Sequence, residues 1–151
     1  GLKTTPYSYA LDGLWVGDMP QTAYVMGATL TPIKGLRLQG ILKMYDKNYS
    51  DWSPNAREYD GSDADADRSQ VWMAPKYNRL DLHGSYKLPK IGGLDMSITG
   101  HIFNALDAVY VQDAVDNSQY NGYGDKLHLP HNAEVFLGTP RYANIGLVVN
   151  F

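Results

Sequence analysis

The chain has 151 residues, 13 basic and 16 acidic side chains giving a net charge of −3, and no cysteine. This length predicts one domain, and the lack of cysteine excludes disulfides, thiolate metal ligands and cysteine nucleophiles. No basic run stands out, which argues against nucleic acid as a partner. The 12 Tyr and 3 Trp against 3 Phe favour surfaces that are half wet, because Tyr and Trp have an apolar body and a polar tip.

Apolar and polar residues alternate with period two in successive runs, which is the pattern of half-buried strands. The first run, 6–16, is poorly defined, around Tyr7, Tyr9, Leu11 and Trp15. The second, 22–31, is weak, and the third, 36–45, alternates clearly. The later runs are 78–88, 94–104 and a last run that places Ala143, Ile145, Leu147 and Val149 on one face. Five or six antiparallel strands are therefore expected, and the fold class is all-β.

The connections between these runs alternate between tight and long. Residues 32–35 and 89–93 are short turns rich in Pro and Gly, whereas 50–77 and 106–139 are long. Short turns on one side and long loops on the other are typical of a transmembrane β-barrel, and runs of about 10 residues suit tilted membrane strands. Alternation alone also fits a soluble β-sandwich, whose apolar face packs on a second sheet.

An ordered set of segments resembles the C-terminal barrel strands of a TonB-dependent outer-membrane receptor of the Bacteroidetes type. The segments are residues 16–22, 30–38, 45–52, 72–77, 101–107 with Tyr110 and Val111, 137–141, and the terminal Phe151. Phe103 and Ala105 depart from the commoner residues of the family's penultimate-strand motif. The resemblance covers nearly the whole chain.

The resemblance implies that residues 1–151 are the C-terminal portion of a barrel of roughly 22 strands with a plugged lumen. The plug domain and the segment that contacts TonB would lie outside this chain. The implied function is import of a large or scarce nutrient, of the siderophore, glycan, peptide or vitamin class, with no enzymatic activity and no cofactor. The alternative is a small β-barrel or β-sandwich module that binds a ligand.

The implied location is the bacterial outer membrane, with the two tight turns in the periplasm and the two long connections outside the cell. The implied partners are the remainder of the same barrel and its plug domain, the TonB complex, and outer-membrane lipid. A surface lipoprotein is a further candidate partner.

Three sets of residues are candidates for specific roles. The terminal aromatic Phe151, with Val149 and Leu147 at alternating positions, resembles the signal read by the barrel-assembly machinery. Loop aromatics could stack on a ligand such as a sugar ring or could pack the loops together; they are Trp52, Tyr59, Trp72, Tyr110, Tyr120 and Tyr123. The alternating carboxylates Asp60, Asp63, Asp65 and Asp67 form a weak calcium candidate that a solvated acidic loop explains more simply.

Other chemistry is not expected. The four histidines show no zinc spacing, and His128 and His131 lack an evident third ligand. No nucleophile elbow and no phosphate-binding glycine loop occurs in the sequence.

Overall fold

The computed structural model describes residues 6–62, 64, 66–90, 92–121 and 127–150. The described backbone is all-β: its strands pair antiparallel, its only helices are three short 3-10 turns, and no sheet closes into a barrel. None of these helical turns is long and apolar enough to cross a membrane. The chain divides into two units, here called the sheet unit (22–46, 76–110 and 138–151) and the loop unit (1–21, 47–75 and 111–137).

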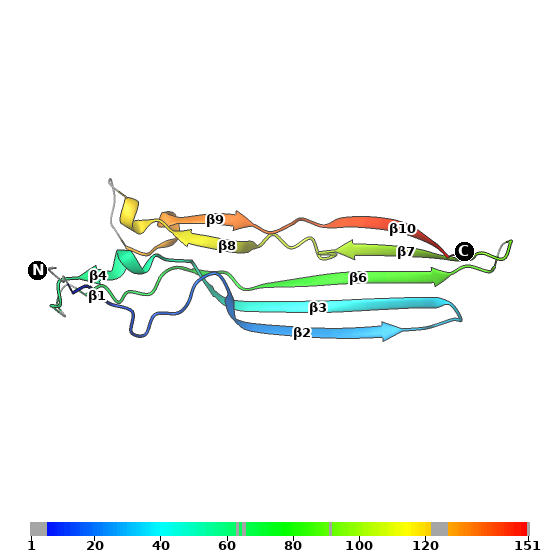
Figure 1. Cartoon of the computed structure of the whole chain (residues 1–151), viewed down its shortest axis with the longest axis horizontal. Helices are drawn as coiled ribbons and strands as arrows, with labels where there is room; N and C mark the ends of the chain where they lie inside the picture. Colours follow the sequence, from blue (N-terminus) through cyan, green and yellow to red (C-terminus); the bar gives the residue numbers. More distant parts are fainter. Residues whose placement is uncertain (1–5, 63, 65, 91, 122–126, 151) are drawn as a thin grey trace, which may run out of the picture. The chain divides into compact units, whose positions relative to one another are not determined.

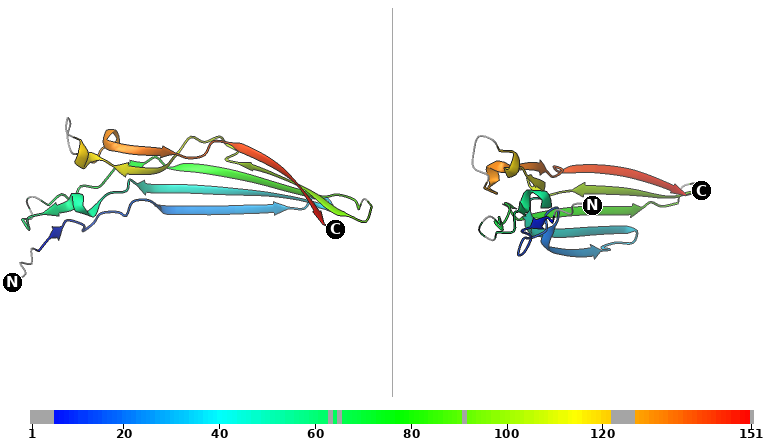
Figure 2. Two further views of the ribbon diagram at one scale, coloured as in Figure 1. Left: turned by 45° about the horizontal axis from the view of Figure 1, so that its top comes forward. Right: turned by 60° about the vertical axis from the view of Figure 1, so that its left-hand side comes forward.

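The sheet unit is built around five long strands. They are β2 (Pro20–Leu30), β3 (Leu36–Tyr49), β6 (Tyr77–Lys87), β7 (Asp95–Phe103) and β10 (Tyr142–Asn150). Their order across the sheet is β10-β7-β6-β3-β2, and Figure 1 shows them side by side. The five strongest predicted runs are thus confirmed as strands. Figure 2 shows the same sheet from two other directions, with β2 and β10 at its edges.

Two tight turns connect neighbouring strands, as the sequence predicts. Gly35 adopts φ +87° at the end of the β2–β3 turn, and Gly92 and Gly93 adopt φ +61° and +87° between β6 and β7. Glycine accepts these left-handed conformations without the steric penalty of a Cβ. The turns therefore hold β2 beside β3 and β6 beside β7.

Strand register aligns the faces of the sheet. Leu36 pairs with Tyr86, Tyr86 with Ile98 and Ile98 with Leu147. Because successive side chains of a strand point to opposite faces, this row fixes the same face on all four strands. We call it the apolar face; its larger members are Leu36, Leu38, Leu42, Leu80, Leu82, Tyr86, Met96, Ile98, Ile102, Ile145, Leu147 and Val149.

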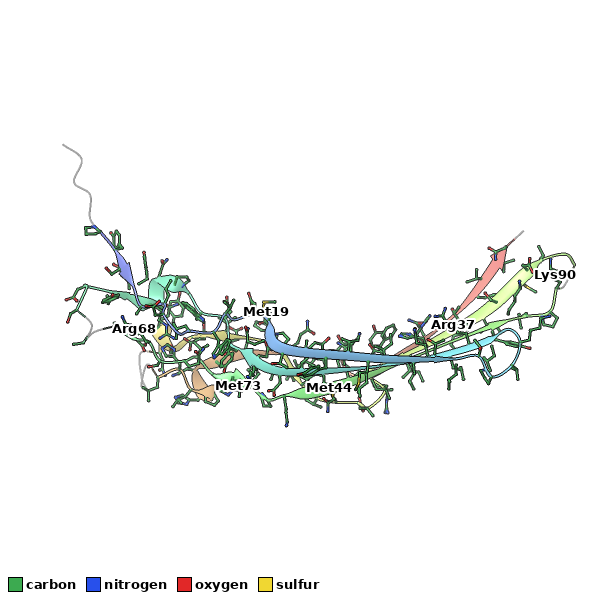
Figure 3. All side chains as sticks on the ribbon, turned by 90° about the horizontal axis from the view of Figure 1, so that it is seen from below. Met19, Arg37, Met44, Arg68, Met73 and Lys90 are labelled. Carbon is green, nitrogen blue, oxygen red and sulfur yellow. The ribbon has the colours of Figure 1, made fainter. Side chains whose placement is uncertain are left out.

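The opposite side, which we call the polar face, carries most of the charged and polar side chains. It contains Arg37, Gln39, Lys43, Arg79, Asp81, His83, Ser85, Lys87, Asp95, Ser97, Thr99, His101 and Asn144. On β2, Thr29 accepts a hydrogen bond from Gln39 (Nε2–Oγ1 3.2 Å), which places Tyr24, Met26 and Leu30 on the apolar side. Figure 3 shows side chains projecting to both sides of the sheet, with Arg37 and Met44 on opposite sides.

The apolar face is exposed. Leu82, Ile98 and Leu147 are 38%, 42% and 62% exposed, so these residues are not enclosed in a compact interior. The buried apolar residues of the described chain are Ala10, Val71, Ala74, Tyr110 and Ala114. Tyr110 is the one that belongs to the sheet unit, and the others are small.

The loop unit contains short elements. β1 (Ser8–Tyr9) pairs with β4 (Glu58–Tyr59), β5 (Met73–Ala74) pairs with the end of β3, and β8 (Val111–Asp116) pairs with β9 (Ala133–Leu137). The 3-10 turns are η1 (Pro54–Arg57), η2 (Ser118–Tyr120) and η3 (Pro130–Asn132). The two long connections therefore carry secondary structure of their own.

The predicted strand over 6–16 is wrong beyond its first part. Only Ser8 and Tyr9 are extended in a ladder, and a turn at Asp12 and Gly13 (φ +81°) follows. Asp-Gly is a strong turn signal because Gly accepts positive φ and Asp bonds to nearby backbone. That signal overrides the alternation of the aromatic residues around it.

Candidate functional site

An ion cluster lies on the polar face of the sheet unit. Asp81 is 2% exposed, and its Oδ2 lies 2.8 Å from Lys43 Nζ on the neighbouring strand. Its Oδ1 accepts a hydrogen bond from the Asn104 backbone N–H at 3.0 Å and lies 3.7 Å from Arg79 Nη2. One carboxylate thus faces two cations, which compensates the cost of burying it.

Tyr110 is packed beside this cluster. Its ring stacks on Tyr77 with centroids 4.3 Å apart, and its hydroxyl accepts a hydrogen bond from Arg79 Nη1 at 3.1 Å. A Cβ on Gly138 would overlap the Tyr110 ring, so only glycine fits there. At 5% exposure, Tyr110 offers little surface to a ligand in this arrangement.

Asn104 fixes the end of β7. Its φ is +50°, in the left-handed region that Asn tolerates better than most residues. Its side chain accepts from Ala108 N–H and donates to the carbonyls of Ala108 (2.9 Å) and Thr139 (3.2 Å). The sequence did not predict these three hydrogen bonds of the Asn104 side chain, although an Asn directly after a strand is a turn signal.

Two histidines face each other on the polar face. His83 on β6 is the register partner of His101 on β7, and their Nδ1 atoms are 2.8 Å apart. Both rings pack near Phe103, with centroids 5.5 and 6.1 Å away. The histidines are 18 residues apart in sequence, so a search for local ligand spacing overlooks them. Counting residues outward from the 89–93 turn in both directions would have placed His83 and His101 on the same face of the sheet.

The loop unit holds a network around His128. His128 Nε2 lies 2.8 Å from Asp67 Oδ2, and Nδ1 lies 2.6 Å from Asp116 Oδ2. Ser118 Oγ donates to Asp116 Oδ2 at 2.8 Å and also meets His128 Nδ1. In a nucleophilic triad, Ser and Asp occupy opposite ring nitrogens. Here Ser118 and Asp67 also contact opposite ring nitrogens of His128. Ser118 is 1% exposed, however, and its hydroxyl donates to Asp116, which shares Nδ1 with it. The network therefore joins the segments around residues 67, 116 and 128.

Asp67 is the electrostatic centre of that network. Partial burial raises the pKa of its carboxyl, but hydrogen bonds from His128 and Ser69 and the charge of Arg57 outweigh burial and lower the pKa to about 2. Arg57 is 1% exposed, and its Nη1 lies 3.1 Å from Asp67 Oδ2. Asp67 is therefore ionised at neutral pH and joins segments around residues 57, 67 and 128.

The aromatic candidates of the loop unit do not share one arrangement. Trp52 donates from Nε1 to the Trp15 carbonyl at 3.0 Å and lies under the Arg57 guanidinium, 5.7 Å from the ring centroid. Tyr59 lies under Arg68 at 5.9 Å. The Trp72 carbonyl accepts hydrogen bonds from both the backbone N–H and the hydroxyl of Ser50. Tyr123 lies outside the described residues.

Tyr120 is the most accessible of the described members of this set, at 76% exposure. It borders an open groove of about 590 Å³ whose other lining residues are Asn117, Asn121, His131, Asn132, Ala133 and Glu134. An exposed aromatic ring next to amides and a carboxylate has the chemistry to stack on a sugar ring and to bond its hydroxyls. Ligand contact by the aromatic residues stays a prediction.

Half of the calcium candidate, Asp63 and Asp65, lies outside the described residues. Of the other two, Asp60 Oδ1 accepts from Ser62 N–H at 2.8 Å and Asp67 is engaged as above. Within the described ranges, no group of three or more His, Asp or Glu is arranged to hold a metal ion.

Of the proposed assembly signal, Leu147 and Val149 lie on the apolar face of β10, opposite Ile98 and Met96. Phe151 lies outside the described residues. The alternation predicted for the last strand is thus confirmed, while its role in assembly stays a prediction.

Comparison with known proteins gives no relative. No family model matches the chain, and neither a curated protein nor a solved structure is significantly similar to it.

Proposed function

We propose that this chain forms part of the wall of an outer-membrane β-barrel of the TonB-dependent receptor type, which imports a large or scarce nutrient. One observation carries the proposal: the apolar face continues from strand to strand across β3, β6, β7 and β10, and most of its larger residues are exposed, as Ile98 and Leu147 illustrate. Hydrocarbon tails would give such a face apolar surroundings, as they do for the outward band of a transmembrane barrel.

Contact with water instead of lipid is unfavourable for this face. Soluble monomers rarely expose large contiguous apolar patches, and here adjacent strands present Leu82, Ile102 and Ile145 together. The edges lead to the same conclusion. β2 and β10 each have one neighbour in the sheet, and open edges are not tolerated in lipid. The proposal therefore includes further strands that pair with β2 and β10, supplied by the remainder of the barrel.

The polar face would then line the lumen. Charged residues there, such as Arg37 and the Lys43–Asp81 pair, would face water or the plug domain instead of lipid. The loop unit would supply extracellular loops, and the groove beside Tyr120 would be one of their ligand-facing surfaces. Coupling to the TonB complex would act through the plug domain, and a surface lipoprotein would be an accessory partner.

The runner-up is a small module that binds a ligand without a membrane. A small closed barrel requires the two edge strands of a sheet to pair with each other, and the described sheets are open. A sandwich requires a second layer over residues such as Ile98 and Ile145. Labels placed on the apolar face distinguish such a module from a membrane barrel.

The printed sequence has no cysteine, so single-cysteine labelling can test the proposal. In the full-length protein reconstituted in lipid vesicles, nitroxide labels at Ile98→Cys and Ile145→Cys should collide readily with oxygen and poorly with chromium oxalate. Labels at Ser97→Cys and Ser85→Cys, on the polar face, should show the opposite preference. Oxygen concentrates in hydrocarbon, whereas the charged complex stays in water.

Two results would contradict the membrane assignment. One is free access of chromium oxalate to positions 98 and 145, as expected of a face in water. The other is protection of both positions from both reagents, as expected of a packed protein interior.

A further inference from the structure

The histidine pair on the polar face is not used by the proposed function. His83 and His101 are direct neighbours across β6 and β7, with ring centroids 5.0 Å apart and Nδ1 atoms 2.8 Å apart. They line a hollow of about 430 Å³ with Arg37, Gln39, Ser85, Thr99 and Phe103. The pair is therefore accessible and is held by two rigid strands.

The spacing of the nitrogens fits metal binding. Two imidazole nitrogens bound about 2.0–2.1 Å from one metal are about 2.8–3.0 Å apart at a right angle and about 3.3 Å apart at a tetrahedral angle. The observed 2.8 Å matches the right angle, which is typical of the tetragonal geometry of Cu²⁺ and Ni²⁺. Rotation of the rings would direct both lone pairs to one point in place of the shared proton.

We propose that His83 and His101 form a two-histidine site for a divalent transition metal, Cu²⁺ before Ni²⁺. Imidazole suits both ions, and Cu²⁺ binds nitrogen ligands most strongly among the first-row divalent metals. Two protein ligands leave the other coordination positions to water or to a small molecule in the hollow. Described residues lining the hollow include one cation, Arg37, and no carboxylate, so an anionic co-ligand would be favoured.

The neighbouring residues support a preformed site. In the register, Gln39 and Asn144 lie beside His83 and His101 in the same row, and their amides can bond to metal-bound water. Phe103 lies beside both rings, with ring centroids 5.5 and 6.1 Å from those of His83 and His101. The site depends on the pairing of β6 and β7 and not on what covers the apolar face. A failure of the membrane assignment would therefore not exclude the metal site.

Copper titration of the full-length protein in detergent tests the inference. We expect one equivalent of Cu²⁺ to give an electron paramagnetic resonance spectrum with superhyperfine structure from two equivalent imidazole nitrogens. His83→Ala or His101→Ala should each weaken Cu²⁺ binding by at least about tenfold, and the double variant should lose little more than either single variant, because each substitution destroys the chelate. His131→Ala, in the loop unit, is the matched control and should leave the affinity unchanged.

Nickel and pH provide second readouts. Ni²⁺ should bind more weakly than Cu²⁺ and should show the same dependence on both histidines. Binding of either ion should weaken as the pH is lowered, because metal and proton compete for imidazole nitrogen. A wild-type spectrum without two-nitrogen structure would overturn the site without reference to any variant. A wild-type Cu²⁺ affinity equal to that of the double variant would also overturn the site. His83 and His101 would then be a hydrogen-bonded pair only.

Discussion

Single carboxylates hold the loop unit together, and Asp67 shows how. Its pKa of about 2 lies below the ordinary value of 3.8, so its contacts favour the folded state. A depressed carboxyl pKa contributes its full stabilisation above the ordinary value, and the contribution is lost as the pH falls toward the folded-state pKa. The window for Asp67 is therefore about pH 4 to 2.

Substitution of Asp67 by Asn should reveal this window. At pH 5 we expect hydrogen exchange of β9 and the preceding residues 127–132 to be faster in Asp67→Asn than in wild type, because His128 and Arg57 lose their charged partner. Near pH 2 most of the difference should be gone, because wild-type Asp67 is then about half protonated and has lost most of its stabilising effect. Comparing the two proteins at each pH cancels the intrinsic dependence of exchange on pH.

Peptides from β6, in the sheet unit, are the control and should exchange equally in both proteins. A difference that persists unchanged at pH 2 would mean that the Asp67 charge does not hold this segment.

Individual contact residues were the hardest feature to predict from the sequence. The aromatic and acidic candidates were chosen by composition, whereas Asn104, His83 and His101 gain their contacts through strand ends and register. Tyr110 illustrates the converse, since it was selected as a loop aromatic and is buried against Tyr77. Residue type indicates what a side chain can do, but its neighbours decide whether it is accessible.

The strand is the scale at which the sequence was most informative. Period-two alternation identified β2, β3, β6, β7 and β10, and the tight turns identified two neighbouring pairs, β2–β3 and β6–β7. The exception is the first run, where the Asp12–Gly13 turn limits β1 to two residues. Short elements such as β4 and β5 were missed because two residues are too few for alternation to be recognised.

A charge on each face of β7 should separate lipid from water. Ile98 lies near the middle of the strand on the apolar face, and Ser97 lies beside it on the polar face. We expect Ile98→Arg to lower the free energy of unfolding in lipid vesicles by about 2–4 kcal/mol, the cost of Arg on the lipid side of a barrel near the membrane centre. Ser97→Arg should change it by less than about 0.5 kcal/mol.

Guanidinium unfolding of the full-length protein measures both values. The 42% exposure of Ile98 makes the test decisive, because a partly exposed position in water tolerates Arg at little cost. Equal stabilities for the two variants would count against a lipid-facing strand.

At the scale of the whole molecule, the open edges are the main feature. β10 pairs only with β7 among the described strands, so alternate N–H groups of β10 have no ladder partner. In a complete barrel those groups would be bonded to the next strand.

Hydrogen exchange of the full-length protein in detergent can detect that partner. We expect all amides of 142–150 to exchange as slowly as those of residues 82–86 in β6, which are paired on both sides. Exchange of about half of the β10 amides within the fastest phase would indicate a free edge and would contradict barrel closure through β10. A peptide covering residues 82–86 of β6, measured in the same sample, is the internal standard.

The sequence by itself determined the all-β class, the positions and faces of the five long strands and the two tight turns, because alternation and turn chemistry act between residues close in the chain. Only the tertiary structure decided which polar groups meet: Asp81 with Lys43, His83 with His101, and Asp67 with His128. These contacts join residues 18 to 61 positions apart, and they depend on strand register and loop closure. A shift of one residue between two strands would exchange every partner and leave the local pattern of each strand unchanged.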